Sequence, residues 1–341
     1  MPRRASRLSL LLLLASLTGL GGIWLWRDYQ ARLREELLSR PLPAVADIHI
    51  PAGSSARQIA EFSAAAGVPV DITTFIALTK HLQIDSSLRA GRYRFAAGVS
   101  VQDILSDMAA GNVIAERLTI VEGKTAADLR TMLTTDERIK NDLAGLSDAD
   151  LRRALNIEYD ATEGLFMPNT YFFEEGHAAS DILRRAHNHM TRILTELWPM
   201  RSDDSILSSP YEALTLASMV EKETGVAEER PLIASVFVNR LRRGIPLQSD
   251  PTVIYGLGDD FDGNLTRSHL RDKSNRYNTY AHRGLPPTPI ALPSRAALEA
   301  VLNPPDAPYY YFVATGDGRH VFSKTLREHN NAVNKYQRQR S

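Results

Sequence analysis

The sequence of 341 residues contains no cysteine and carries no net charge at neutral pH. Without cysteine the chain has no disulfide, no thiol nucleophile and no thiolate metal ligand. Its 40 basic side chains are balanced by 40 acidic ones. This balance argues against a nucleic-acid-binding protein, because phosphate contacts usually require a strongly basic face. A chain of this length has room for about two domains.

Several common catalytic motifs are also absent. The sequence has no H-E-x-x-H, no G-x-S-x-G, no P-loop and no G-x-G-x-x-G. His187 and His189 form the one close histidine pair, and helical residues two positions apart point in different directions. These absences exclude zinc hydrolases, serine esterases and nucleotide-dependent enzymes. We therefore expect neither a metal nor a cofactor.

Leu8–Trp26 is a long uncharged stretch close to the amino terminus. A helix of about 20 apolar residues crosses a bilayer, so residues 8–26 are predicted to be a transmembrane helix. A cleaved signal peptide is the alternative, but no clear A-x-A cleavage site follows the apolar stretch. Three arginines precede it, which places residues 1–7 in the cytoplasm and the rest of the chain on the far side of the membrane.

Residues 27–46 are predicted to form a stalk or linker. Asp28–Arg40 combines charged side chains with leucines at helical spacing, and the prolines that follow, Pro41 and Pro43, end the helix.

A local pattern occurs three times after the stalk. Each copy has an alternating apolar stretch, a turn with glycine, a serine or threonine, and an amphipathic helix, which predicts strand, turn, capped helix. The copies are Ile48–Ala65, Tyr93–Ala109 and Leu118–Leu133. The first two, with the helical stretch Ile72–Leu82 between them, predict a small α+β domain over residues 47–118. The pattern fits either a spacer or a glycan-binding module.

Residues 119–341 are predicted to form a second domain, mainly helical with a small β-sheet. The spacing of apolar residues predicts a series of helices, and the aromatic run near the carboxyl end predicts a β-hairpin around Gly316–Gly318. The predicted helices are Ala126–Leu133, Asp148–Leu155, Ser180–Trp198, Tyr211–Thr224 and Glu228–Arg243. The fold class expected for the whole chain is α+β, with an N-terminal transmembrane helix.

Two glutamates near the end of the predicted helix Tyr211–Thr224 are candidate acids. Setting successive residues 100° apart places Glu221 and Glu223 on opposite flanks of an apolar face. Partial burial there raises the pKa of a glutamate and keeps a proton available for catalysis. The same position also suits a structural glutamate paired with lysine or arginine. Helix geometry does not choose between the two residues.

Polar and aromatic side chains follow in loops on this helical scaffold. The stretches Leu247–Gly256 and Gly258–Pro293 are rich in amides, hydroxyls and aromatic rings. Such loops are typical of carbohydrate clefts, where rings stack on sugars and amides bind hydroxyl groups. On the terminal helix, His329 and Asn330 face either this cleft or solvent.

The motifs of the second domain closely resemble those of the endolytic murein transglycosylases, the MltG or YceG-like family. Glu163–Tyr171 matches the pattern E-G-x-x-x-P-x-T-Y of that family, with Asn169 where aspartate is common. The remaining matching segments are Ala217–Thr224, Ala234–Leu241, Leu247–Gly256, Tyr277–Tyr280, Gly284–Pro287 and Tyr311–Ala314. The resemblance extends over nearly the whole chain, in the order membrane anchor, LysM-like subdomain and catalytic domain.

The resemblance implies a bacterial peptidoglycan lyase. Such an enzyme is anchored in the inner membrane with its catalytic domain in the periplasm, and cuts the β-1,4 bond between N-acetylmuramic acid and N-acetylglucosamine in nascent strands, which terminates their elongation. Peptidoglycan synthases are expected as further partners. By the resemblance the catalytic residue is Glu221, and substrate-binding residues are Glu223, Gln248, Asp250, Asn278 and Tyr280, any of which can instead hold loops in place.

A single carboxyl group suffices for the implied reaction. It protonates the glycosidic oxygen and then takes the proton of the muramic acid C6 hydroxyl, which closes onto C1 as a 1,6-anhydro ring. Two alternatives remain: a muramidase, which uses water as the acceptor, and a membrane-tethered glycan-binding scaffold without catalysis.

Overall fold

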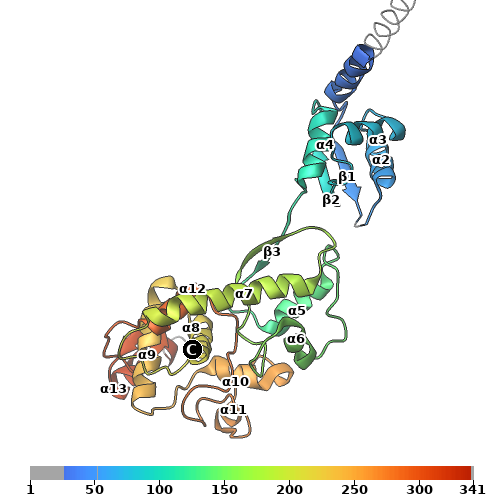
Figure 1. The fold of residues 1–341 in the computed structure, drawn as a ribbon. Coiled ribbons are helices and arrows are strands. Elements are labelled where there is room, and N and C mark those ends of the chain that lie inside the picture. Colours follow the sequence, from blue (N-terminus) through green and yellow to red (C-terminus); the bar gives the residue numbers. More distant parts are fainter. Residues whose placement is uncertain (1–26, 52, 339–341) are drawn as a thin grey trace, which may run out of the picture. The chain divides into compact units, whose positions relative to one another are not determined.

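The computed structural model describes residues 27–51 and 53–338, and their contacts divide the chain into two compact units with the boundary between Glu116 and Arg117 (Figure 1). Residues 27–39 are helical, as the leucine spacing predicts. The predicted transmembrane helix, residues 8–26, lies outside the described residues. Within the part of the chain that is described, no helix is long and apolar enough to cross a membrane.

The first unit is a small α+β structure. Its elements are β1 (Ala46–Ile50), α2 (Ala56–Ala65), α3 (Ile72–His81), β2 (Gly91–Phe95) and α4 (Val101–Ala110). Strands β1 and β2 pair antiparallel, with Ala46 opposite Phe95 and Ile50 opposite Gly91. Alternate residues of β1 are buried, and the three helices supply the rest of the core. The strands and helices predicted from the first two copies of the pattern are confirmed.

The same turn chemistry starts a helix in all three copies. The side chains of Ser55, Ser100 and Thr125 each accept a hydrogen bond from the backbone amide three residues later, which satisfies a free amide at the start of α2, α4 and α5. In the third copy Gly123 has a φ of +74°, a left-handed conformation that glycine adopts without strain. The predicted caps are therefore present.

The second unit is mainly helical. Its elements are β3 (Glu116–Ile120), which begins at the boundary, α5 (Ala126–Thr135), α6 (Asp148–Leu155), β4 (Asn169–Phe173), α7 (Ala179–Leu197), η1 (Trp198–Met200), α8 (Pro210–Glu223), η2 (Ala227–Glu229), α9 (Arg230–Arg242), α10 (Asp250–Leu257), η3 (Gly258–Asp260), α11 (Arg267–Arg271), α12 (Arg295–Leu302), β5 (Tyr311–Ala314), β6 (His320–Ser323), α13 (Leu326–Val333) and η4 (Asn334–Arg338). Strand β3 pairs with β4, and β5 with β6. The predicted α+β fold class is confirmed for the described residues.

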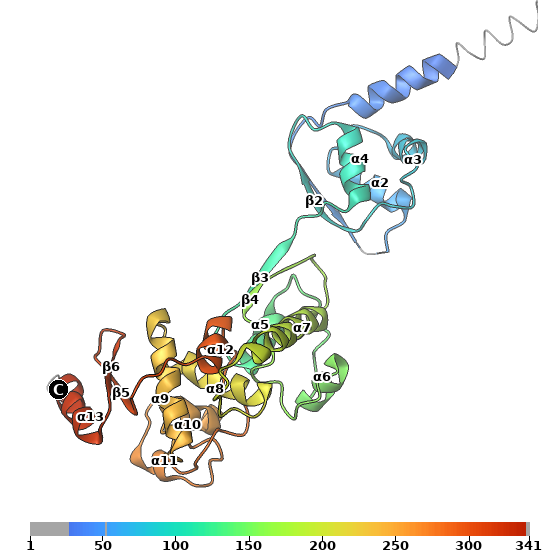
Figure 2. The ribbon, with the colours of Figure 1, turned by 60° about the vertical axis from the view of Figure 1, so that its left-hand side comes forward.

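Helix α8 lies at the centre of this unit, where it packs against α9, α10 and α12 (Figure 2). Every residue from Ala213 to Glu221 is buried. The expectation of one apolar face with two half-exposed flanks is therefore wrong for α8, because neighbouring helices cover several sides of it. Its polar side chains tolerate burial because they bond within the unit: Thr215 donates to the carbonyl of Tyr211, and Ser218 to that of Thr215.

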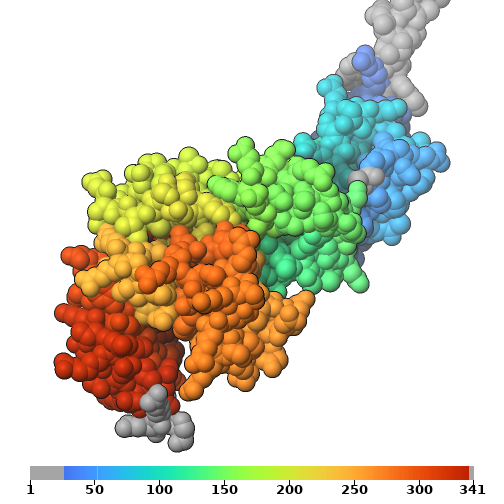
Figure 3. Space-filling model, turned by 90° about the horizontal axis from the view of Figure 1, so that it is seen from below, coloured from blue at the N-terminus to red at the C-terminus, as the bar shows by residue number. Residues whose placement is uncertain are grey.

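The carboxyl end forms the predicted hairpin. In the antiparallel pair β5 and β6, Tyr311 lies opposite Ser323 and Ala314 opposite His320. Helix α13 packs on both strands. On the face shown in Figure 3, the segment coloured red, which includes α13, adjoins the orange segment after α9. The carboxyl-terminal segment therefore lies close to the polar loops that follow α9.

Candidate active site

A cleft with a volume of about 380 Å³ opens in the second unit, between the carboxyl end of α8, the start of α10, the β5–β6 hairpin and α13. Its lining is largely polar. The charged and polar side chains that line it include Glu223, Arg240, Gln248, Asp250, Tyr280, His320 and His329. Four of the five substrate-binding residues suggested by the sequence are in this group.

Glu223 is the last residue of α8 and is the protonatable group of the cleft. Its Oε1 accepts a hydrogen bond of 2.5 Å from the hydroxyl of Ser249. Burial raises the pKa of Glu223 to about 7; the Ser249 hydrogen bond and the charge of Arg240 lower it, and the charge of Asp250 raises it. A pKa near 7 suits a carboxyl group that both gives and takes a proton close to neutral pH.

Arg240, on α9, is a buried arginine that organises one wall of the cleft. Its Nε donates to the carbonyl of Tyr310 at 2.7 Å, and its Nη1 donates to the carbonyl of Leu247 at 2.8 Å and to Oε1 of Gln248 at 3.2 Å. The guanidinium also lies over the ring of Tyr311, 5.1 Å from its centre. This residue joins α9 to the hairpin and to the loop before α10. Arg240 was not among the site residues predicted from the sequence, although it lies in the family-matching segment Ala234–Leu241.

Asp250 and Tyr280 form a hydrogen-bonded pair at the amino end of α10. The hydroxyl of Tyr280 donates to Oδ1 of Asp250 at 2.6 Å, and burial together with this bond raises the pKa of the tyrosine. Asp250 is the first residue of α10, where a negative charge is favoured by the helix dipole. The sequence predicted the two residues but not the helix: Pro251 falls within its first turn, which is compatible with a helix start.

The backbone around Gln248 aligns the two polar loops. Gln248 has a φ of +55°, and its amide donates to the carbonyl of Thr279 at 3.1 Å. The amide of Ser249 donates to the hydroxyl of Thr279 at 3.0 Å. These bonds hold Ser249, the partner of Glu223, beside the loop that carries Tyr280.

Asn278 does not line the cleft. It is fully buried, and its side-chain amide donates to the carbonyls of His269, Leu270 and Asp272. Its Oδ1 accepts from the amide of Tyr280 at 3.0 Å. Asn278 therefore fixes the loop. Of the two roles considered for it, substrate binding and holding a loop in place, this geometry favours the second.

Glu221 also lies outside the cleft lining. Its side chain is only 3% exposed, and its Oε1 lies 3.3 Å from Nη2 of Arg230 at the start of α9. Its Oε2 accepts from both the amide and the hydroxyl of Ser294, at 2.8 and 2.5 Å. Because Ser294 caps α12, this carboxylate connects α8, α9 and α12. The geometry is that of the structural alternative, a buried glutamate paired with arginine.

A hydrogen-bonded pair of a histidine and a glutamate borders the cleft. Nδ1 of His320 lies 2.8 Å from Oε2 of Glu229, and the backbone amide of His320 donates to Oε1 at 2.8 Å. Burial by itself raises the pKa of Glu229, but the hydrogen bonds from His320 lower it on balance. This pair fastens β6 to the turn that follows α8. No pattern in the sequence indicated this pair.

Glu163, in the family motif, is a buried carboxyl group away from the cleft. Its oxygens accept hydrogen bonds from the amide of Ala126 at 3.0 Å, the amide of Gly164 at 3.2 Å and the hydroxyl of Tyr255 at 3.1 Å. Burial raises the pKa of Glu163 to about 7 despite these donors. The residue connects the start of α5 to α10.

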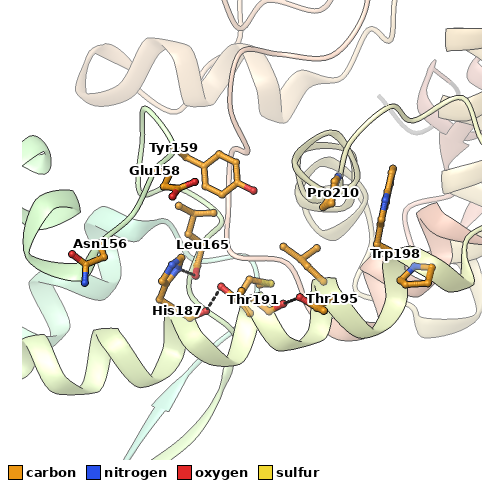
Figure 4. A pocket seen from close by; sticks show the side chains of 12 residues that line it. Asn156, Glu158, Tyr159, Leu165, His187, Thr191, Thr195, Trp198 and Pro210 are labelled. Atoms are coloured by element: carbon orange, nitrogen blue, oxygen red, sulfur yellow. Dashed lines mark hydrogen bonds between the residues drawn. The ribbon is translucent and has the colours of Figure 1, made fainter.

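A larger cavity, of about 580 Å³, lies between α7 and the amino end of α8. The rings of Tyr159 and Trp198 border it, and His187 and Thr191 project into it from α7 (Figure 4). Nδ1 of His187 lies 3.2 Å from the carbonyl oxygen of Leu165, and the hydroxyl of Thr191 donates to the carbonyl of His187. Of these two cavities, the smaller cleft is the one lined by a carboxyl group with a pKa near 7. No group of three or more histidine, aspartate or glutamate side chains in residues 27–51 and 53–338 could hold a metal ion.

Fold and site together define a class of protein. A helical unit that presents a half-buried glutamate with a raised pKa to an open polar cleft is typical of an enzyme that uses general acid–base catalysis. The chain belongs to the YceG-like family, whose model matches residues 48–335. The family expected from the sequence motifs is thereby confirmed.

The chain is also similar to named proteins. The chain is 31% identical over 307 residues to the endolytic murein transglycosylase of Bacillus subtilis strain 168, covering 85% of this chain and 84% of the relative. It is 27% identical over 318 residues to the endolytic murein transglycosylase of Streptococcus pneumoniae serotype 2 strain D39, covering 84% of this chain and 57% of the relative. A crystal structure of a YceG-like protein from Listeria monocytogenes is similar with a TM-score of 0.49 and 30% identity, covering 85% of this chain and 99% of the other.

Proposed function

We propose that this protein is a lytic transglycosylase that cuts the β-1,4 bond between N-acetylmuramic acid and N-acetylglucosamine within peptidoglycan strands and leaves a 1,6-anhydro end. The family and the names of its relatives support the substrate. The observation that carries the chemistry is Glu223, a half-buried carboxyl group with a pKa of about 7 in a polar cleft.

The reaction needs one group that first gives and then takes a proton. Protonated Glu223 donates to the glycosidic oxygen as the bond from C1 breaks, and positive charge develops on the sugar ring. The resulting carboxylate then accepts the proton of the C6 hydroxyl of muramic acid. The C6 oxygen bonds to C1, which closes the anhydro ring and restores the protonated glutamate. No water is consumed.

Neighbouring side chains set the proton affinity of Glu223. Its pKa results from burial and from the opposing charges of Asp250 and Arg240. Ser249 fixes one carboxyl oxygen through its hydroxyl group, which leaves the other oxygen to face the substrate. Asp250, held by Tyr280, adds a negative charge that suits the positive charge developing on the sugar. We propose that these residues and Gln248 bind or orient the glycan.

We assign the acid to Glu223 in place of Glu221, the residue to which the sequence resemblance led. An acid must reach the substrate, and Glu221 has both carboxyl oxygens bonded to Arg230 and Ser294. Glu223 lines the cleft and has one oxygen without a bond to the protein in its described surroundings. The accessible position and the raised pKa support this assignment.

Product analysis tests the reaction. The full chain in detergent is incubated with uncrosslinked glycan strands, and the released fragments are analysed by mass spectrometry. A lyase leaves ends about one water lighter than the hydrated reducing ends of a hydrolase. Anhydro ends within strands support the proposal, and hydrated ends alone would refute it. Binding to the strands without any release would instead support a scaffold.

One observation favours hydrolysis as the second candidate function. A hydrolase needs a second carboxylate to activate water, and Asp250 lines the same cleft as Glu223. If Asp250 acts as that base, Asp250→Asn abolishes hydrated products. Under the lyase mechanism the same variant keeps forming anhydro ends at a lower rate, because Asp250 only tunes the charge in the cleft.

We also propose that residues 8–26 anchor the protein in the bacterial inner membrane, with residues 1–7 in the cytoplasm and the catalytic unit in the periplasm. The uncharged stretch and the arginines before it support this orientation. In this setting residues 47–118 form a LysM-like module, either a spacer or a glycan-binding unit, and peptidoglycan synthases are neighbouring partners. A reporter enzyme fused at the carboxyl end should be active only in the periplasm; cytoplasmic activity would refute the orientation.

A further inference from the structure

His329 lies on α13 and contributes to the wall of the cleft opposite α8. Its ring stacks on Tyr311, with 5.2 Å between the ring centres and 24° between the planes. Helix α13 has no buried residue of its own, so core packing does not account for a histidine at this position. The proposed mechanism does not use this side chain.

The two ring nitrogens of His329 differ in their surroundings. Nδ1 is buried and has no hydrogen-bond partner among the described residues. The polar groups nearby are satisfied within the protein: Tyr280 donates to Asp250, Ser249 to Glu223, and Arg240 to backbone carbonyls. Nε2 also has no hydrogen-bond partner among the described residues but is not buried, so it is the accessible nitrogen of the ring.

These surroundings determine where the proton of the ring resides. Burial and the nearby charge of Arg240 lower the pKa of His329, so the ring is neutral at pH 7. A neutral imidazole has one N–H donor and one acceptor nitrogen. A buried N–H without a partner is rarer in proteins than a buried acceptor without one. The proton therefore belongs on Nε2, the nitrogen that is open to the cleft.

We propose that His329 donates a hydrogen bond from Nε2 to an oxygen of the glycan bound beside Glu223. This inference rests on the proposed function, because it takes the occupant of the cleft to be a glycan. A sugar polymer offers many hydroxyl and acetamido oxygens as acceptors. The hydroxyl groups of Ser249 and Tyr280 already donate within the protein, so His329 adds a second donor beside the side-chain amide of Gln248. The contact forms with the bound substrate, before any bond breaks.

Binding measurements test this proposal without turnover. Peptide-free glycan strands are titrated into the full chain carrying Glu223→Gln, alone and combined with one further change. His329→Phe keeps an aromatic ring on Tyr311 but removes both nitrogens, and His329→Gln keeps a donor near the position of Nε2. Asn330→Ala, an exposed change one residue along α13, is the matched control.

We expect His329→Phe to weaken binding about 3- to 10-fold, the effect of one neutral hydrogen bond. His329→Gln should restore affinity to within about twofold, and Asn330→Ala should leave it unchanged. Equal affinity of His329→Phe and its parent would overturn the proposal. So would an equal loss with Asn330→Ala, since that result would assign the effect to α13 as a whole.

Kinetics with Glu223 intact provide a second test. A ground-state contact predicts that His329→Phe raises KM with little change in kcat. A fall in kcat at constant KM would mean that His329 acts on the chemical step, which contradicts the proposal. A failure of the proposed function would give different results. Cleavage would survive Glu223→Gln, or the unaltered enzyme would not cleave the strands at all, and neither result depends on how His329 affects binding.

Discussion

Glu221 and Glu223 lie two residues apart on α8, yet one closes an ion pair with Arg230 and the other faces the cleft. On a helix, residues at this spacing point in different directions. Glu221 meets α9 and the cap of α12, whereas Glu223 meets Ser249 before α10. The motif E-K-E thus combines a carboxylate that holds three helices together with one that can transfer a proton.

Glu223→Gln removes the proton that the reaction needs. We expect a loss of about 10²–10⁴-fold in kcat, the usual contribution of a positioned general acid, with the fold retained because glutamine has nearly the same shape. The release of soluble fragments from glycan strands measures it. The assignment fails if the variant keeps more than a tenth of the normal rate.

The pH dependence of kcat/KM should report the same group. With a pKa of about 7 for Glu223, the rate falls as pH rises above about 7, because the proton donor is lost. Asp250 raises this pKa by its charge, so Asp250→Asn should move the falling limb to lower pH. Glu163→Gln is the control and should leave the limb in place. If the falling limb of the pH profile stayed at the same pH in Asp250→Asn, that result would contradict the electrostatic role of Asp250.

Glu221→Gln should act on stability. Breaking a buried ion pair leaves Arg230 without its charge partner, which costs about 3–5 kcal/mol. In a unit of this size we expect Tm to fall by about 6–12 °C in thermal unfolding. Asp204→Asn, which breaks an exposed pair with Arg242, should change stability by less than about 1 kcal/mol. If Glu221→Gln instead kept its Tm and lost activity, Glu221 would be the acid.

Glu163 predicts a pH dependence of the free energy of unfolding. The pKa of Glu163 is about 7 in the folded chain and about 4.5 for an ordinary glutamate, so between these pH values the folded state holds more protons than the unfolded state. The stabilisation is complete below about pH 4.5 and is lost as pH rises through about 7, by roughly 3 kcal/mol. Denaturant titrations at several pH values give the free energy of unfolding at each pH. We expect this free energy to depend less steeply on pH in Glu163→Gln than in the unaltered protein.

The matched control for that slope is Glu122→Gln, because Glu122 is exposed. Its titrations should follow those of the unaltered protein. Equal slopes for Glu163→Gln and the unaltered protein would show that Glu163 is not the source of the effect.

Gly256→Ala tests the packing that holds the polar loop on α10. A Cβ at Gly256 would overlap the side chain of Asn275, which is buried and bonded to the carbonyl of Val253 and the amide of Tyr277. We expect about 1–3 kcal/mol of destabilisation and reduced activity, because the same loop carries Tyr280. Hydrogen exchange of residues 275–281 should become faster. Unchanged exchange there would contradict this role of Gly256.

Local features of the chain are determined by the sequence alone. Caps such as Ser55 and Thr125, the leucine spacing of residues 27–39 and the turn at Gly316–Gly318 all correspond to the observed elements. They depend on interactions among residues a few positions apart, which a pattern in the sequence records directly. The family motifs likewise pointed to the segments that line the cleft.

Which side chain can perform the chemistry was decided only by the tertiary structure. Glu221 and Glu223 have equivalent places in the sequence pattern, and they differ through Arg230, Ser294 and Ser249, which other elements bring to them. Proton affinity depends on burial and on charges in space, and both arise from contacts between distant segments. The same reason explains why Asn278 bonds to loop carbonyls and His329 faces the cleft, two placements that no local pattern contains.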